Sequence, residues 1–570
     1  MKIKHLFGLA VIAAMTASCS SNEDLGNPGS GTNEAGVGYA TFTINLPSVG
    51  GTRAADAGGA EMDEGTAKEY AVKSATALIF QKYGSDEGSY KFVESVTLPI
   101  DGWTDDPEDG ITTTSKKLTA KLTNVDTKNT YAVLVLLNNK TASGVKITLP
   151  SVGQSYNEWN NNAQLPTVTD LAAENDFYMA NAPLKVDASP TTLVTIYPTK
   201  EKAEAGTSAA TVYVERGVAK MSVTAPGTKK VTDKATNTET NSTVEFSNWA
   251  LDITNKKTYA VHNIDGLSTD FSAIWTTARF TGTNNRIYWG KDPNYSNKIL
   301  KETDKDAERE AEFNFIKATS GINKTFTESE YCLENTFNLE NMYQGQTTRV
   351  IFKATYTPKD NAGNSLADAG GTFYTIGNMT TILKEADLKT AVDAAATSVL
   401  PGCVVEYANL EKEGSHVITL EDIKENASST THLDGATKYV IGTGKKTGDE
   451  IVAAINAKLG LKAGRSEEMV GINTYLNGVT YYIARVRHFD DDKTPWSSGE
   501  AYNAENGKYL GRYGMLRNNS YVLEVGKVFG PGYPGVPPVD PTLPDDENEK
   551  YLSVSVKILS WAKRSHTVDL

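Results

Sequence analysis

The stretch Gly38–Ala54 has the sequence GYATFTINLPSVGGTRA, and the interpretation of the whole chain depends on it. Its first half alternates apolar and polar side chains with a period of two, which predicts a β-strand with one buried face. The buried face consists of Ala40, Phe42, Ile44 and Leu46. A Pro-Ser-Val-Gly-Gly turn follows, and Arg53 then stands before Ala54 among small residues, where a trypsin-like protease can reach it. The stretch therefore predicts a strand that packs into a core and that one cut can release.

The bulk properties of the chain point to an extracytoplasmic all-β protein. Its 570 residues are enough for two to four domains, and its formal charge of −14 argues against binding to nucleic acids or anionic membranes. Threonine, valine, tyrosine, glycine and asparagine are abundant, as in secreted β-proteins. Three cysteines are too few for a disulfide scaffold. Cys332 and Cys403 could pair in an oxidising compartment or stay as buried thiols, and the sequence leaves both alternatives open.

The N-terminus is a targeting segment, predicted to be a lipoprotein signal peptide over residues 1–18. Two lysines precede an apolar run over 6–14, and Thr-Ala-Ser-Cys at 16–19 then resembles a bacterial lipobox. The residues before the cysteine are small, as lipid attachment requires, although Thr16 stands where leucine is usual. We therefore expect lipidation of Cys19; the alternative is an ordinary signal peptide that contains a cysteine. No later run approaches the roughly 18 apolar residues of a membrane span.

Strand-like runs follow throughout the chain and are separated by turn residues. This pattern favours a β-sandwich over alternating strands and helices. The predicted strands are 72–83, 131–137, 191–197, 212–223, 245–254, 349–358, 478–489 and 520–528. The run 131–137 is apolar on both faces, which predicts a central strand. Two short helices, predicted over 384–396 and 449–459, are expected to decorate the sandwich.

A polar stretch over 226–242 predicts a boundary between two β-sandwich domains, at 54–225 and 226–530. Residues 19–53 are then a tether with the removable strand, which makes them a propeptide. Residues 531–570 form a Pro-rich spacer and a last strand. The expected architecture is all-β with minor helices.

The C-terminal segment contains a second strand that matches the first. Six prolines and an acidic end over 530–549 predict a stiff polyproline arm that holds this strand away from the body. The apolar face of the strand consists of Leu552, Val554, Val556 and Ile558. Burying three or four such side chains is worth about 5–10 kcal/mol, so one groove could take either strand. If a cut at Arg53 frees the first strand, the tail of another copy can replace it, and repeated head-to-tail contacts of this kind give a filament.

Short motifs along most of the chain resemble the Bacteroidales fimbrillins, in particular the major stalk subunit of the minor (short) fimbriae, a type V pilin. The motifs are the lipobox at Cys19, TRA at 52–54, VERGVAK at 214–220, YCLENTF at 331–337, YYIARVRH at 481–488, LRNNSY at 516–521 and the C-terminal SVSVKILSW with HTVDL. The resemblance implies two transthyretin-like sandwich domains, export as an outer-membrane lipoprotein precursor, and cleavage after Arg53 by an arginine-specific extracellular protease. It further implies polymerisation by C-terminal strand exchange on the cell surface. The implied partners are other copies of the chain, fimbrial anchor and tip subunits, and host or bacterial surface receptors.

Residues that could carry other chemistry are isolated, so we expect no enzyme, no cofactor and no metal site. Glu334 lacks an identifiable partner carboxylate, and the acidic run at 490–492 is better explained as an exposed hairpin tip than as a calcium site. Trp289 and Trp496 could be glycan platforms, but isolated aromatic residues are more often partly buried. Arg517 and its neighbour Asn518 are expected to start the strand that follows them.

The leading hypothesis is a polymerising stalk subunit that supports adhesion. A fimbrial tip or accessory adhesin on the same fold is the nearest alternative, and a surface glycan-binding lipoprotein is the alternative from a different class. The intact spaced tail argues against a tip subunit, because a tip does not need to donate a strand onward. Arg53 argues against an anchor that stays uncleaved.

Overall fold

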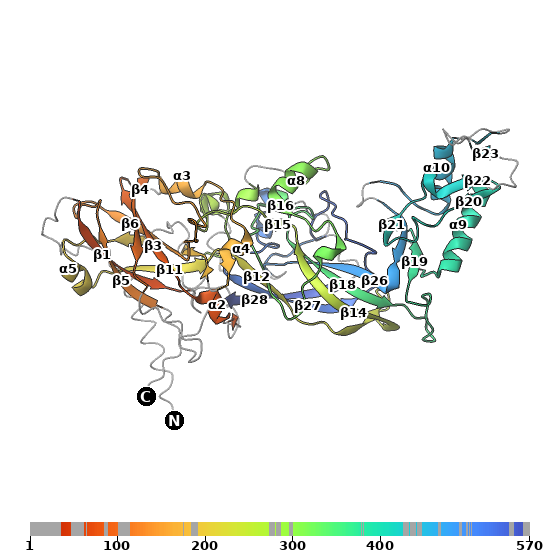
Figure 1. Cartoon of the computed structure of the whole chain (residues 1–570), viewed down its shortest axis with the longest axis horizontal. Helices are drawn as coiled ribbons and strands as arrows, with labels where there is room; N and C mark the ends of the chain where they lie inside the picture. Colours follow the sequence, from red (N-terminus) through yellow and green to blue (C-terminus); the bar gives the residue numbers. More distant parts are fainter. Residues whose placement is uncertain are drawn as a thin grey trace, which may run out of the picture.

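The computed structural model of the chain is built mainly from β-strands, with few helices, as expected. It describes residues 36–46, 62–63, 65–84, 89–100, 115–174, 176–183, 192–272, 280, 287–295, 300–377, 379, 381–425, 432–433, 440–441, 447–464, 469–489, 493–497, 500, 502, 504–546 and 552–561. Two large sheets lie one after the other along the molecule, and a small mixed unit follows at the far end (Figure 1). No helix in these ranges is long and apolar enough to cross a membrane.

The first sheet has eight strands and contains the N-terminal strand. Its order is β4 (Tyr90–Leu98), β3 (Ala75–Lys82), β6 (Tyr131–Leu137), β9 (Met179–Asn181), β11 (Ala210–Arg216), β1 (Gly38–Asn45) and β5 (Ser115–Leu122), and β10 (Thr192–Val194) pairs with β6. Every residue of β6 is buried, as predicted for a central strand. The sheet curls, so its two edge strands lie close together. There the Glu94 carboxylate accepts hydrogen bonds from the backbone N–H groups of Thr123 and Asn124, at 2.9 Å each.

The chain passes from the first sheet to the second at Gly217, so the single strand expected over 212–223 is in fact two strands. These are β11 and β12 (Ala219–Val223). A Cβ atom at Gly217 would lie 2.8 Å from the Tyr178 ring, and the Gly217 N–H donates to the Tyr178 carbonyl. The backbone therefore turns where only glycine fits.

The second sheet contains the C-terminal strand. Its order is β17 (Glu330–Cys332), β12, β27 (Asn519–Val528), β13 (Thr228–Thr232), β14 (Glu239–Asp252), β18 (Arg349–Thr357) and β26 (Val479–Arg485), and β28 (Leu552–Trp561) pairs with β27 and with β2 (Met62–Asp63). The polar stretch 226–242, expected at a domain boundary, forms most of the β13–β14 hairpin.

The two predicted helices do more than decorate a sandwich. They are α9 (Glu385–Val399) and α10 (Gly448–Lys458), and they share a separate apolar core with small strands at one end of the molecule (Figure 1). The strands of this unit are β19 (Phe373–Ile376), β25 (Ile472–Tyr475) and β21 (Gly414–His416) in one sheet, with β20 (Cys403–Val405) and β22 (Ile423–Glu425) in another. The helix α10 begins with a capping box between Thr447 and Glu450, which satisfies backbone N–H groups at its N-terminus.

The remaining elements are short connections. The strands are β7 (Ala172–Ala173), β8 (Asp176–Phe177), β15 (Thr254–Asn255), β16 (Phe313–Asn314), β23 (His432–Leu433) and β24 (Val440–Ile441). The helices are α2 (Ala67–Tyr70), α3 (Tyr156–Asn160), α4 (Val168–Leu171), α5 (Lys200–Ala205), α6 (Leu267–Asp270) and α8 (Asp306–Glu312), with 3₁₀ turns η4 (Pro293–Tyr295), η5 (Thr319–Gly321), η6 (Leu339–Asn341), η7 (Leu420–Asp422), η8 (Leu476–Gly478) and η9 (Ala504–Tyr509).

Both described cysteines are free thiols. Cys332 lies in the second sheet, where burial raises the pKa of its thiol well above the usual range, and Cys403 lies in the far unit. Of the two alternatives that the sequence left open, the structure has the buried thiols.

Candidate strand-exchange site

The N-terminal strand β1 lies inside the first sheet, with a neighbour on each side. It runs antiparallel to β5, from Gly38 opposite Leu122 to Asn45 opposite Ser115. It runs parallel to β11, where Phe42 lies opposite Ala210. Within the described residues, β5 pairs with no other strand, so β1 alone joins β5 to the sheet.

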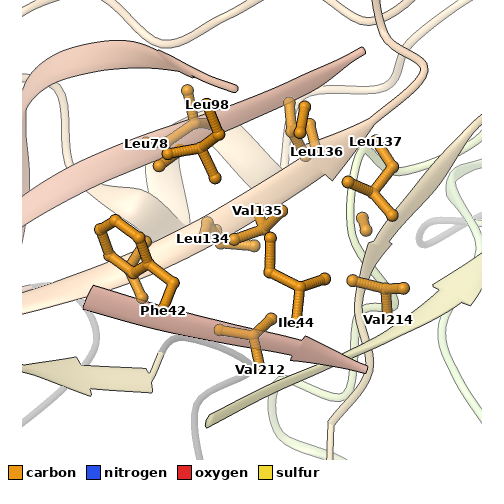
Figure 2. Close-up of a cluster of buried hydrophobic side chains, with 14 of the residues drawn as sticks. Phe42, Ile44, Leu78, Leu98, Leu134, Val135, Leu136, Leu137, Val212 and Val214 are labelled. Atoms are coloured by element: carbon orange, nitrogen blue, oxygen red, sulfur yellow. The ribbon is translucent and has the colours of Figure 1, made fainter. Parts of the chain in front are cut away.

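The apolar face of β1 is part of the core. Ala40, Phe42 and Ile44 are 0% exposed and Leu46 is 2% exposed. Figure 2 shows Phe42 and Ile44 among leucine and valine side chains from β3, β4, β6 and β11. A strand with two neighbours and four buried apolar side chains would leave a deep apolar groove if it were removed.

The opposite face of β1 is partly covered by the short helix α5. Thr41 is only 1% exposed, and its hydroxyl donates to the Ala203 carbonyl of α5 at 2.9 Å. The Thr119 hydroxyl of β5 lies 3.2 Å away. There is also no room for a side chain at Gly38, because a Cβ atom there would lie 2.4 Å from the Ile196 side chain. The groove therefore makes a specific demand at two positions besides the four apolar ones: at Thr41, which faces α5, and at Gly38, where the apolar face begins.

The C-terminal strand β28 lies against its own second sheet. It is antiparallel to β27, from Leu552 opposite Val528 to Ser560 opposite Asn519. On its other side, pairing in the described part of the chain is limited to β2 at the last two residues of β28. Val554 and Val556 pack against the second core but are only half-buried. The side chains of Leu552 and Ile558 lie outside the described part.

The Pro-rich segment lies against the second sheet, so the prediction that it holds the last strand away as a free arm is wrong. Arg349 donates to the Pro537 carbonyl at 2.7 Å and to the Pro538 carbonyl at 3.1 Å. Two aspartates at its end pair with buried arginines: Arg485 lies 3.3 Å from Asp545, and Arg512 donates to Asp546 at 2.7 Å. We call these contacts over 537–546 the arginine clamp.

The clamp buries charge, and burial changes how that charge titrates. Burial raises the pKa of Asp545 to about 6, although the nearby Arg485 guanidinium and a hydrogen bond from Thr347 act in the opposite direction. Burial also lowers the pKa of Arg485. The sequence did not reveal the clamp, because its arginines come from three separate stretches of the chain. The register of β18 and β26 places Arg349 directly opposite Arg485, and two arginines facing each other in adjacent strands are the signal that could have indicated the clamp.

The junction between the two sheets holds a second group of buried charges. Glu334 accepts a hydrogen bond from Arg517 at 3.0 Å, so it is an ion-pair partner and not an isolated acid. Arg517 also donates to the Thr258 hydroxyl, and the Asn518 side chain accepts from the Arg216 backbone N–H. Three of the motifs that suggested the family, at 214–220, 331–337 and 516–521, thus meet at this junction, and Arg517 does more than start β27.

The two tryptophans that were weighed as glycan platforms are covered. Trp289 is 1% exposed and packs edge-on against Phe337, and Trp496 is partly buried against the same core. The predicted lipidation residue Cys19, the predicted cleavage residues Arg53 and Ala54, and the tail beyond Trp561 lie outside the described residues.

Residues 473–567 match the family described as major fimbrial subunit protein type IV, fimbrillin, C-terminal. No curated protein matches the chain. Three solved structures are similar over long stretches. A candidate cell adhesion protein from Parabacteroides distasonis is 11% identical, with a TM-score of 0.37, covering 92% of this chain and 98% of that chain. A candidate cell adhesion protein from Bacteroides eggerthii is 12% identical, with a TM-score of 0.33, covering 93% and 98%. A fimbrial assembly protein from Parabacteroides distasonis is 13% identical, with a TM-score of 0.26, covering 61% and 94%.

The family match includes the donated side of the site, whereas β1 and its neighbours β5 and β11 lie outside it. Strands β26, β27 and β28 and the whole arginine clamp segment lie within residues 473–567. Over this region the chain is similar to the fimbrillins, in agreement with the resemblance drawn from its motifs.

Proposed function

We propose that this protein is the stalk subunit of a surface fimbrium and polymerises by protease-activated donor-strand exchange. The observation that carries the proposal is the contrast between two strands of the same pattern. The N-terminal strand β1 fills a two-sided groove, and the C-terminal strand β28 lies mostly unpaired on one side within the described residues. Each has four apolar side chains at a period of two.

Exchange gives the donated strand more burial than its resident position. Val554 and Val556 are half-buried on β27, whereas the apolar positions of the groove are 0–2% exposed. Full burial of a valine side chain is worth at least about 1.5 kcal/mol, so moving a half-buried valine into the groove gains about 1 kcal/mol. The backbone also gains pairing on a second side, which adds about 0.5–1.5 kcal/mol for each hydrogen bond. These gains favour the polymer once the groove is empty.

Cleavage supplies the empty groove. Before a cut, β1 is covalently joined to the body, so no external strand competes with it effectively. A cut after Arg53 leaves β1 as part of a separate peptide, which can dissociate and be replaced. An arginine-specific extracellular protease would suit this position, and lipidation at Cys19 would hold the precursor at the outer membrane until then.

The arginine clamp determines where the donated tail begins, because the clamped residues stay with the donor. The clamp ends at Asp546, six residues before β28 begins at Leu552. The strand can therefore leave β27 without breaking the clamp, and the clamped segment stays with the donor. Anchor and tip subunits, and surface receptors bound by the assembled fimbrium, would then be further partners.

The test is polymerisation of the purified chain after trypsin treatment. We expect ladders on non-boiled gels for the wild type and none for Arg53→Ala. Arg53→Lys is the matched control: trypsin should restore the ladder, whereas an arginine-specific protease should not. Deleting residues 551–570 should stop growth and leave the fold intact by circular dichroism. Ladders from Arg53→Ala equal to those of the wild type would refute activation at this residue.

A further inference from the structure

We propose that the donated strand enters the groove of its neighbour in a single register, which Ser553 sets by taking the place of Thr41. This inference rests on the strand exchange proposed above. The matched register places Leu552, Val554, Val556 and Ile558 where Ala40, Phe42, Ile44 and Leu46 stand in the uncut chain. The serine face of the donated strand then faces α5.

The position of Thr41 is the first reason for this register. Thr41 is 1% exposed under α5, and its hydroxyl donates to the Ala203 carbonyl at 2.9 Å. A strand that replaces β1 must put a small side chain there, and a hydroxyl group keeps that carbonyl hydrogen-bonded. In the matched register this residue is Ser553, which is small and carries the hydroxyl.

The space at Gly38 excludes the register shifted by two residues in one direction. That shift places Val554 at the position of Ala40 and therefore Leu552 at the position of Gly38. A Cβ atom at this position would lie 2.4 Å from the Ile196 side chain and 2.9 Å from that of Val125. No residue from 547 to 570 is a glycine. A strand in that register would have to leave the sheet before Leu552 and lose its first apolar residue.

The opposite shift is excluded by charge. It places Leu552 at the position of Phe42 and the charged Lys550 at the position of Ala40, which is 0% exposed in the core. An unpaired charge at such a site is strongly unfavourable. Shifts by one residue turn the serine face toward the core and the apolar face toward α5. In the matched register Lys550 falls at the position of Gly38, so the strand enters the sheet only after Lys550 and still keeps all four of its apolar residues. The other registers lose an apolar residue, bury a charge or turn the wrong face to the core.

Ser553 also has a partner in its resident position. There its hydroxyl oxygen accepts a hydrogen bond from the Lys527 backbone N–H at 2.7 Å, beside the irregularity in the β27–β28 pairing. A Cβ atom at Gly526 would lie 2.7 Å from the same oxygen, so the site has little spare room. The hydroxyl thus accepts a hydrogen bond before exchange and donates one to α5 of the neighbour afterwards.

Disulfide trapping between two full-length variants tests the register. Thr43 lies opposite Lys117 of β5, and Lys117 is exposed. The matched register puts Ser555 in the place of Thr43. A Lys117→Cys chain is mixed with a chain that carries cysteine at position 553, 555 or 557, and the mixture is cut with trypsin under mild oxidation. Directly opposed positions in an antiparallel pair are within disulfide range.

We expect disulfide-linked dimers from Ser555→Cys at least tenfold more abundant than from Ser553→Cys or Lys557→Cys. The uncut mixture is the control and should give none, because β1 still fills the groove. Equal or stronger linkage from Lys557→Cys or Ser553→Cys would overturn the register while leaving strand exchange intact. The absence of both ladders and cross-links would instead refute strand exchange itself. The natural thiols Cys332 and Cys403 are buried and compete little.

A matched pair of size variants tests the role of Ser553. Ser553→Leu puts a large side chain under α5 of the neighbour, so ladder growth should slow by about tenfold or more. Ser555→Leu adds the same bulk at a half-exposed position, and its growth rate should stay within about twofold of the wild type. The melting temperature of each uncut variant reports any effect on the resident position. Equal growth rates for the two variants would overturn the assignment to Ser553.

Discussion

Phe42→Ala should weaken the uncut subunit and accelerate its assembly, two effects that an ordinary core substitution does not combine. Phe42 is 0% exposed between β5 and β11, and the loss of a buried phenylalanine costs about 3–5 kcal/mol. The uncut variant should lose this amount of unfolding free energy in the domain that contains the first sheet. After the cut, the same loss falls on the strand that must leave. Since about 1.36 kcal/mol is a factor of ten, release should speed up by about two to four orders of magnitude.

The assay combines urea unfolding of the uncut chain with the growth rate of ladders after trypsin treatment. Val554→Ala is the control, because this residue enters the groove rather than leaving it. Val554→Ala should lower the unfolding free energy of the uncut chain by about 1 kcal/mol, because Val554 is half-buried there, and it should slow ladder growth. Ile44→Val, which costs about 0.5–1.5 kcal/mol, gives a milder version of Phe42→Ala that is certain to stay folded enough to measure. If Phe42→Ala slowed ladder growth as much as Val554→Ala does, β1 would not be the strand that is replaced.

Three further predictions concern the buried charges. Arg512→Met leaves Asp546 without its ion-pair partner, so protease cleavage within 537–546 should increase in native protein while β1 stays protected. Burial raises the pKa of Asp545 to about 6, so between about pH 3.8 and pH 6 the native protein keeps a proton on Asp545 that the unfolded chain has lost. The stabilisation that this proton provides is complete below about pH 3.8 and disappears as the pH rises through 6. The stability of Asp545→Asn relative to the wild type should therefore rise by about 2 kcal/mol between pH 4 and pH 7 in urea titrations, and a constant difference would contradict this. Glu334→Gln removes the carboxylate that is paired with the buried Arg517 guanidinium and should cost about 3–5 kcal/mol of unfolding free energy, whereas loss of an exposed pair would cost less than about 1 kcal/mol.

The periodicity of apolar residues correctly predicted the strands and helices whose own side chains carry a clear pattern. The run 131–137 is apolar on both faces, and it is β6 with the predicted bounds. Strands β18 and β27 and the helices α9 and α10 also lie where the pattern placed them. These elements were predictable because their own side chains carry the signal.

Other elements were missed because their signal is weak or comes from elsewhere in the chain. β5 has the sequence SKKLTAKL, in which three lysines hide the alternation of Leu118, Ala120 and Leu122. β5 forms beside β1, its only strand partner among the described residues, so it depends on a segment more than 70 positions away. The break at Gly217 depends on the Tyr178 ring, which no local pattern reports. The Pro-rich segment looked like a free arm because arginines distant in sequence hold it.

The sequence by itself determined that Gly38–Ala54 and the C-terminal strand share one pattern of four apolar residues, and that an arginine follows the first of them. A period of two shows which side chains share a face. It does not show which strands become neighbours, because pairing depends on contacts between residues far apart in the chain. Only the tertiary structure decided that β1 has a neighbour on both sides and a fully buried apolar face, while β28 lies half-buried on its own sheet. That difference in burial between two similar strands is the physical basis for exchanging them.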